Sequence, residues 1–157
     1  MTLTEWPDLA AEVPPIPVSV SHKTVQVFLP PIEMLANRWG EISGMLEKAT
    51  SRTLCYEPID LLMLAGTGQV GIWLCMWGEE IDAVVATQVT TYPRRRVMEV
   101  LFGGGSNMRR WIKPLVAAID QHARDLGCSH VATAGRPGWI RAWGAHATGD
   151  IIMVREI

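Results

Sequence analysis

The sequence predicts one mixed α/β domain, in which a mostly antiparallel sheet carries helices on both faces. Two observations support this class: consecutive apolar segments rich in valine, threonine and isoleucine, and flanking segments with apolar residues at three- and four-residue spacing. A third observation is a strand–helix–strand order near the C-terminus, which predicts one parallel strand pair. The 157 residues, 48% hydrophobic and 19% charged, suit a single domain with a substantial core.

The N-terminal half divides into an arm and the start of the domain. Residues 1–22 form a predicted arm that is extended or irregular, because it carries Pro7, Pro14, Pro15 and Pro17. The domain then spans residues 23–157. Alternation over 25–29 predicts a strand, and helical spacing predicts helices over 32–49 and 58–65, the second ended by Gly66.

The middle of the chain is predicted to be an antiparallel meander of three strands, over 70–77, 81–92 and 97–102. A turn at 78–80 joins the first two strands, and Arg94, Arg95 and Arg96 form the tip of the second hairpin. A glycine run follows as a loop, and a long helix ends at Gly127. Because an interior proline costs about 3 kcal/mol, Pro114 predicts that this helix begins near Lys113, after a separate turn.

The C-terminal part is predicted to continue with a strand over 129–134, a short helix over 137–146 and a last strand over 151–157. The long helix joins the strands 97–102 and 129–134 as a right-handed crossover, so these two strands should run parallel.

Composition restricts the classes of function. The formal charge of −2 gives no pull towards nucleic acid, and no apolar run has the roughly 20 residues that cross a bilayer. The N-terminus lacks the pattern of a secretory signal, so we expect a cytoplasmic protein. Cys55, Cys75 and Cys128 are far apart, which predicts reduced core thiols and no metal site.

An ordered set of short motifs carries a family resemblance. It includes Trp39, the segments 72–74 and 84–87, and Tyr92-Pro93-Arg94. It continues with Gly103-Gly104 before Trp111, Ala123-Arg124 before Gly127-Cys128, and Gly135-Arg136-Pro137-Gly138-Trp139. With these residues the chain resembles the GNAT superfamily of N-acetyltransferases, and more closely the GNAT-like proteins of bacteriophages and prophages. The resemblance covers about 25–157.

The resemblance implies a fold, a cofactor and a location for it. In this family the fourth and fifth strands splay apart and hold acyl-CoA, here acetyl-CoA, while the following loop binds the pyrophosphate. The residues at that loop are Gly103, Gly104, Gly105, Ser106 and Asn107. Backbone amides at a glycine-rich helix N-terminus attract phosphate.

The loop departs from the family pattern. Phe102 stands where the family has Gln or Arg, and Asn107 stands where it has Gly or Ala. The alternative interpretation is a turn in which Ser106 or Asn107 caps the helix.

Glu99, in the strand before this loop, is the candidate general base for an amine. The alternative is a carboxylate on the exposed side of a strand. His130 and His146 are further candidates, whereas the tyrosine that often serves the family as general acid has no counterpart after Tyr92. Arg136 is a candidate phosphate or carboxylate ligand, or else a structural tie between helix and sheet.

Two functions are therefore open. One is an acyl-CoA-dependent N-acyltransferase with an unidentified amine acceptor. The other is a non-enzymatic phage virion or assembly protein that retains the fold. For the second, partners would be other phage proteins, or a second copy bound through the arm, and the location would be the virion or the host cytoplasm.

Overall fold

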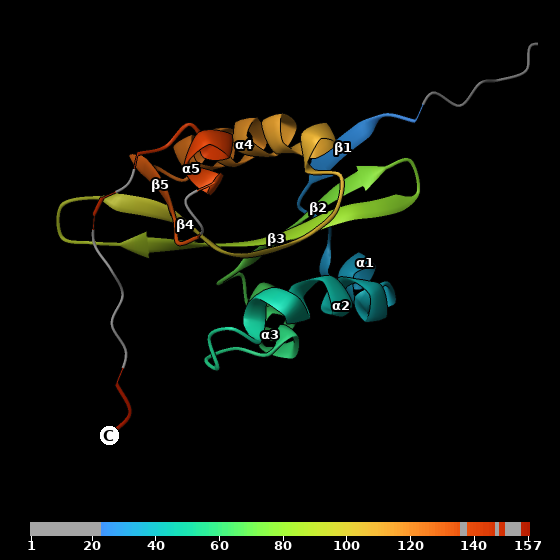
Figure 1. Cartoon of the computed structure of the whole chain (residues 1–157), viewed down its shortest axis with the longest axis horizontal. Coiled ribbons are helices and arrows are strands. Elements are labelled where there is room, and N and C mark those ends of the chain that lie inside the picture. Colours follow the sequence, from blue (N-terminus) through green and yellow to red (C-terminus); the bar gives the residue numbers. More distant parts are fainter. Residues whose placement is uncertain (1–22, 136–137, 147, 150–154) are drawn as a thin grey trace, which may run out of the picture.

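The computed structural model describes residues 23–135, 138–146, 148–149 and 155–157. Its centre is a five-stranded sheet in the order β1-β2-β3-β4-β5. The first three neighbouring pairs are antiparallel and β4–β5 is parallel. Helices cover both faces, with α1, α2 and α3 on one side and α4 and α5 on the other (Figure 1). The predicted fold class is confirmed.

The strands follow the predicted meander, with shifted ends. They are β1 (Val25–Phe28), β2 (Gly71–Trp77), β3 (Glu80–Thr91) and β4 (Arg96–Gly105). β2 and the first half of β3 are buried on both faces, which explains their nearly continuous apolar runs. Only Gly78 and Glu79 separate β2 from β3, and Gly78 has the positive φ of 59° that such a tight turn requires.

The helices on the first face are α1 (Ile32–Asn37), α2 (Trp39–Thr50) and α3 (Pro58–Gly66). The single helix predicted over 32–49 is wrong, because the chain breaks at Arg38, whose φ of −113° is not helical. Apolar spacing continues across the break, since Leu35, Ile42 and Leu46 all enter one core. The stop predicted at Gly66 is also displaced: Gly66 is still helical, and Gly68 takes the left-handed φ of 78°.

On the second face, α4 (Met108–Asp125) is one continuous helix, so the start predicted near Lys113 is wrong. Pro114 lies inside it. The helix continues because it buries Trp111, Leu115, Ile119 and Ala123 against the sheet, and this burial outweighs one missing hydrogen bond. The stop at Gly127 is confirmed, with φ of 75° and the Cys128 amide bonded to the Ala123 carbonyl at 2.8 Å.

The crossover then leads to β5 (His130–Thr133) and to the short helix α5 (Gly138–Trp143). Both elements were predicted with longer bounds. The predicted last strand over 151–157 lies mostly outside the described residues, and residues 155–157 are not in a strand. The predicted arm, residues 1–22, also lies outside them.

Two bulges bend the sheet where the elements meet. The register between β2 and β3 shifts after Cys75, which leaves Asp82 without an opposite residue. The register between β3 and β4 shifts after Ala86, and Leu101 is the extra residue there. A bulge turns side chains and backbone groups away from the regular ladder. The first bulge lies at the start of α4, since Asp82 bonds Asn107 and Arg110.

The glycine run is strand and not the predicted loop. Gly103, Gly104 and Gly105 pair with Val85, Val84 and Ala83. A Cβ on Gly104 would overlap the backbone carbonyl of Met45 in α2, and one on Gly105 would overlap the backbone at Asp82. The sheet and α2 therefore approach each other closely only because Gly104 has no side chain, and Gly105 allows the same closeness between β4 and β3.

This packing gives the first prediction. Gly104→Ala should lower the free energy of unfolding by about 2–3 kcal/mol, since α2 must move to admit the methyl group. Urea denaturation of the full chain measures the loss. Valine at this position, with its larger side chain, should disturb the packing against Met45 still more.

Gly103→Ala is the matched control. A Cβ there would lie 3.5 Å from the nearest atom, a Val85 methyl carbon, which is an ordinary contact. It should change the stability by less than about 1 kcal/mol. Equal losses in the two variants would contradict the assigned contact between Gly104 and Met45.

Candidate functional site

The pairing between the parallel strands β4 and β5 ends at a defined point. Their pairing runs from Val97–His130 to Val100–Thr133. The Thr133 hydroxyl donates to the Val100 carbonyl at 3.4 Å and marks the last contact. β4 continues to Gly105, and along 101–105 the described part of the chain provides no strand on that side. The expected parallel pair is thus present; its pairing ends with β5 at Val100 and Thr133, which form the apex of an opening beside the rest of β4.

A two-residue connection, Ser106 and Asn107, joins β4 to α4. Asn107 has the left-handed φ of 58° and ψ of 39°, so the chain turns sharply into the helix. The described residues provide no acceptor for the backbone N–H groups of Asn107, Met108 and Arg109. Unpaired amides at a helix N-terminus bind anions.

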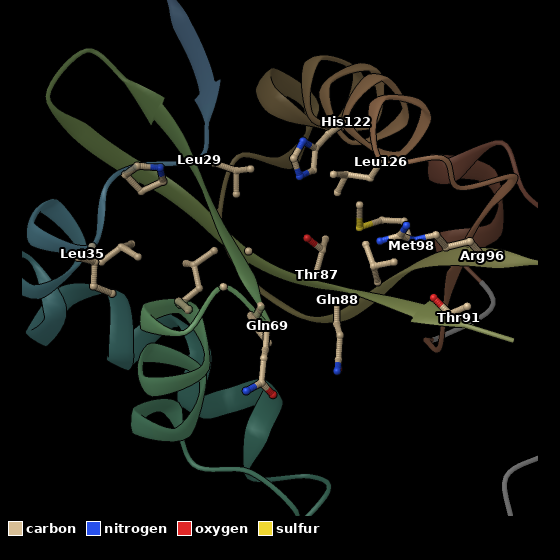
Figure 2. Close-up of a pocket in the computed structure, with 18 residues that line it drawn as sticks. Leu29, Leu35, Gln69, Thr87, Gln88, Thr91, Arg96, Met98, His122 and Leu126 are labelled. Atoms are coloured by element: carbon tan, nitrogen blue, oxygen red, sulfur yellow. The ribbon is translucent and has the colours of Figure 1, made fainter.

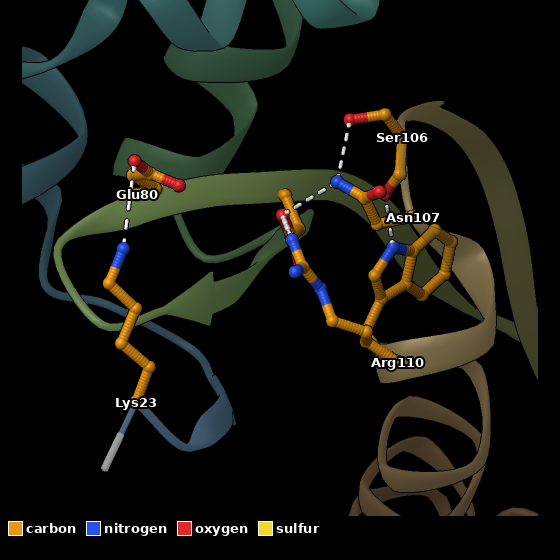
Figure 3. A network of polar contacts seen from close by, with 7 residues as sticks. Lys23, Glu80, Ser106, Asn107 and Arg110 are labelled. Carbon is orange, nitrogen blue, oxygen red and sulfur yellow. Dashed lines mark hydrogen bonds and ion pairs between the residues drawn. The ribbon is translucent and has the colours of Figure 1, made fainter.

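The connection is held by Asp82, the bulge residue of β3 (Figure 3). Its carboxylate, only 4% exposed, accepts two hydrogen bonds from Arg110, at 3.0 Å from Nε and 2.8 Å from Nη2. The side-chain amide of Asn107 donates to the same carboxylate at 3.3 Å, and the Ser106 amide donates to the Asp82 carbonyl at 2.8 Å. A bidentate arginine fixes both position and orientation.

Aromatic side chains complete this network. The guanidinium carbon of Arg110 lies 4.4 Å from the ring centre of Trp77, a cation–π contact. The indole N–H of Trp111 donates to the Ser106 carbonyl at 2.7 Å. Neither Ser106 nor Asn107 caps α4 with its side chain, so the capping alternative from the sequence is wrong. Side-chain bonds to β3 take the place of a cap.

The first turn of α4 is unusually basic. It contains Arg109 and Arg110 and no acidic residue. Cations at a helix N-terminus oppose the helix dipole, and Arg110 is compensated by Asp82. Arg109 is exposed, and the described residues give it no ion-pair partner. Free amides and an uncompensated arginine together favour a bound anion.

Phe102 does not face this site. It is buried in the core on the α1–α3 side and meets Tyr56 edge-to-face, with ring centres 5.4 Å apart. The position where the family has Gln or Arg thus serves packing. Any anion here would be held by backbone amides and Arg109.

Glu99 lies one residue before the apex of this opening, half-exposed. It accepts a hydrogen bond from the Tyr92 hydroxyl at 2.7 Å. This bond, and then the Glu99 charge, raises the pKa of Tyr92, so the phenol stays protonated at neutral pH. Sequence analysis missed Tyr92 as a site residue. The signal was available, because both residues belong to one predicted hairpin.

In the described part of the chain, neither His130 nor His146 forms a hydrogen bond or ion pair with Glu99 or with the start of α4. His130 is exposed and its ring bonds the adjacent Ser129 hydroxyl, and His146 is exposed. Arg94 and Arg95 form the predicted hairpin tip. Arg136 and the side chain of Trp139 are outside the described residues.

The thiols follow the prediction only in part. Cys75 is buried, and burial raises its pKa to about 12, but Cys55 is exposed and Cys128 is intermediate. The described ranges contain no cluster of three His, Cys, Asp or Glu that could hold a metal ion.

Two open hollows of about 570 and 920 Å³ lie in the described part, and neither is lined by the glycine run. The first follows β3. The second lies between α2 and the start of α3, and many of its lining residues are exposed. The open backbone edge of β4 beyond Val100 defines the candidate site.

Comparison with solved structures agrees with this geometry. Wild-type TTHA1254 from Thermus thermophilus matches with a TM-score of 0.58 at 19% identity, over 84% of this chain and 96% of that one. An aminoglycoside acetyltransferase, meta-AAC0020, from an uncultured soil metagenomic sample matches with a TM-score of 0.64 at 11% identity, over 85% and 95%.

A ribosomal-protein-alanine N-acetyltransferase from Brucella melitensis biovar Abortus 2308 matches with a TM-score of 0.63 at 13% identity, over 85% and 99%. Another match is a GNAT family acetyltransferase from Staphylococcus aureus. At these identities the likeness concerns the fold, which is the GNAT fold. No protein-family profile and no curated protein matches the sequence.

None of the helices in the described residues is both long enough and apolar enough to cross a membrane.

The Asp82 network gives the second prediction. Asp82→Ala should lower the free energy of unfolding by about 2–4 kcal/mol, because Arg110 then lacks its partner at the strand–helix joint. Chemical denaturation measures the loss. Glu80→Ala, which removes an exposed carboxylate 3.9 Å from Lys23, is the control and should cost about 0.5 kcal/mol or less. A small loss in Asp82→Ala would refute the anchoring role of this carboxylate.

Proposed function

We propose that this protein is an acyl-CoA-dependent N-acyltransferase. The observation that carries the proposal is the stretch of β4 beyond Val100 that has no strand beside it on the β5 side in the described chain, directly before a helix with free N-terminal amides. The neighbours in fold support it, since they include proteins named as acetyltransferases for an aminoglycoside and for ribosomal-protein alanine.

The residues present account for the pyrophosphate end of acetyl-CoA more clearly than for its thioester end. The amides of Asn107, Met108 and Arg109, with the Arg109 side chain, would hold the pyrophosphate. The open edge of β4 over 101–105 would bond the amides of the pantetheine arm. In this proposal Gly103, Gly104 and Gly105 act through their backbone, and Ser106 positions Trp111. When bound, the cofactor supplies a thioester carbonyl for attack by an amine.

Glu99 is the proposed general base. Its carboxylate lies next to the apex, on the side away from the pyrophosphate end, and would accept a proton from the attacking amine. The Tyr92 hydroxyl orients this carboxylate through the 2.7 Å hydrogen bond. Tyr92 is thus a positioning residue in the proposal. A cytoplasmic location, where acyl-CoA is available, belongs to the same proposal.

The second candidate function, a non-enzymatic protein that retains the fold, is favoured by a specific observation. Packing inside the chain explains why positions 104 and 105 are glycine, because a Cβ at either would overlap backbone atoms, and Phe102 is a core residue. The glycine run is therefore no evidence by itself for a cofactor. The phage or prophage type, with a virion or assembly role in this second candidate, rests on the sequence resemblance alone.

Calorimetry tests the cofactor proposal and gives the third prediction. Full-length protein titrated with acetyl-CoA, up to millimolar concentration at low salt, should release or absorb heat. Arg109→Gln should weaken the affinity about 5–10-fold, by loss of a charge-assisted contact at an exposed position. Arg124→Gln, at the opposite end of α4, should leave the affinity unchanged. The absence of binding in the wild type would leave the non-enzymatic candidate in place of the enzyme.

The fourth prediction concerns the base. The fold neighbours' names suggest acceptors to try, namely an aminoglycoside, glucosamine 6-phosphate and a peptide with N-terminal alanine. With any acceptor that releases CoA thiol in a colorimetric assay, Glu99→Gln should lower kcat about 10²–10⁴-fold. Its affinity for acetyl-CoA should not change, since Glu99 does not contact the proposed pyrophosphate site.

Two further variants give the control and the positioning test. Glu47→Gln, on the exposed side of α2, should keep wild-type rates. Tyr92→Phe should lower kcat less than Glu99→Gln and leave the KM for acetyl-CoA unchanged, because it removes only the bond that orients that carboxylate. Equal rates for Glu99→Gln and Glu47→Gln would exclude Glu99 as the base.

A further inference from the structure

The hairpin of β3 and β4 extends beyond β2 and leaves part of β3 uncovered. The pairing of β2 with β3 ends at Gly71–Thr87, while β3 continues to Thr91. From Gln88 to Thr91 it pairs only with β4, from Glu99 to Arg96. On the other edge of 88–91 the described residues place no strand. Such an edge presents a row of free N–H and C=O groups to which another strand can add.

A hollow of about 570 Å³ follows this edge (Figure 2). Leu35 lies at one end of it and Arg96 near the other, with Thr87 between them. His122 and Leu126 of α4 project towards it from one side. The hollow is therefore elongated along the strand, open to solvent and partly apolar, which suits an extended peptide better than a compact ligand.

The charge of this region selects for an acidic occupant. The residues that line the hollow include Arg96 and His122 and no Asp or Glu. Arg94 and Arg95 are exposed at the adjacent hairpin tip, and the ion pairs found in the described ranges involve neither of them. An acidic segment laid along Gln88–Thr91 would meet this group of cations, to which it is attracted.

The chain itself contains a segment of this kind. Residues 1–22 carry three acidic residues, Glu5, Asp8 and Glu12, and no Lys or Arg. Within them, residues 8–13 contain no proline, so every backbone N–H there is available, and they span about 20 Å as a strand. Leu9, Ala11 and Val13 alternate with Asp8, Ala10 and Glu12. A strand over these residues would therefore have one apolar face and one face with two carboxylates.

We propose that residues 8–13 of a second copy of this chain add as a strand to the free edge of β3. Geometry favours a second copy over the same chain. β1 begins at Val25, opposite Trp77, at the turn between β2 and β3, while the free edge lies at the other end of β3. β1 and β3 are both antiparallel to β2, so the chain before β1 points away from the free edge.

Distance adds to this argument. The arm of the same chain would have to reverse and travel about 30 Å back along the sheet, counting about 3.3 Å for each residue of strand. The nine residues 14–22 reach about 30 Å only when fully straight, and they include three prolines that resist reversal. An exchange between two copies needs no reversal. By symmetry each arm would cover the edge of the other chain. The inference does not depend on acyl transfer.

Sedimentation velocity of the full chain tests the proposal first. We expect a concentration-dependent dimer that weakens as salt rises, because exposed charges are screened. Arg94→Glu with Arg95→Glu should raise the dimer dissociation constant at least tenfold. Arg52→Glu, an exposed arginine on α2's side of the sheet, should leave it unchanged. Adding Asp8→Lys and Glu12→Lys to the doubly reversed hairpin should restore the dimer.

A disulfide test identifies which chain supplies the arm. Two copies with different tags, both Cys55→Ser, carry either Ala10→Cys in the arm or Thr91→Cys on the edge. Mild oxidation of the mixture should form a disulfide that joins the two tags. As a control, the Ala10→Cys copy mixed with a partner that keeps Thr91 should give little cross-linked product. Three outcomes would overturn the proposal: a monomer at all concentrations, a dimer indifferent to the hairpin charges, or a dimer in which oxidation forms no bridge between the two tags.

Discussion

The buried carboxylate of Asp82 is the interaction on which the candidate site depends. It sits at a bulge of β3, and from there it holds Arg110 of the helix and Asn107 of the connection. Because of this joint, β4 passes into α4 through only two residues, and the first helical amides stay in a fixed place. The same joint keeps the guanidinium of Arg110 occupied, which leaves Arg109 as the free cation of the first turn in the described chain.

The sheet has two stretches of strand edge whose backbone groups are available for hydrogen bonds to a ligand or to another strand, and we propose a different role for each. On β4, residues 101–105 border the opening past Val100, where a narrow, amide-rich cofactor arm would bind. On β3, residues 88–91 border an elongated hollow beside a cluster of arginines. The same hairpin carries Glu99 and Tyr92, so an arm bound along β3 would also lie close to the proposed base.

The sequence was sufficient for the order of elements, because each strand and helix shows its own periodicity and nearly every turn has its glycine or proline. It failed where tertiary contacts decide. The helix through Pro114 continues because of the face it buries, and the helix break at Arg38 leaves the apolar spacing intact. The glycine run was correctly marked as special, but the contact with Met45 that requires it lies far away in the chain. The Asp82–Arg110 pair, 28 residues apart, left no local signal either.

The contact between Gly104 and Met45 has a consequence for anyone who compares this chain with its relatives. A glycine pair that survives in every relative is usually taken as the mark of a phosphate loop. Here the same invariance would arise in a protein that binds no nucleotide, since the close approach of α2 demands it. Under the proposed function, Arg109 would be the more informative position, because its side chain is exposed and the described residues give it no ion-pair partner that would preserve it without a ligand.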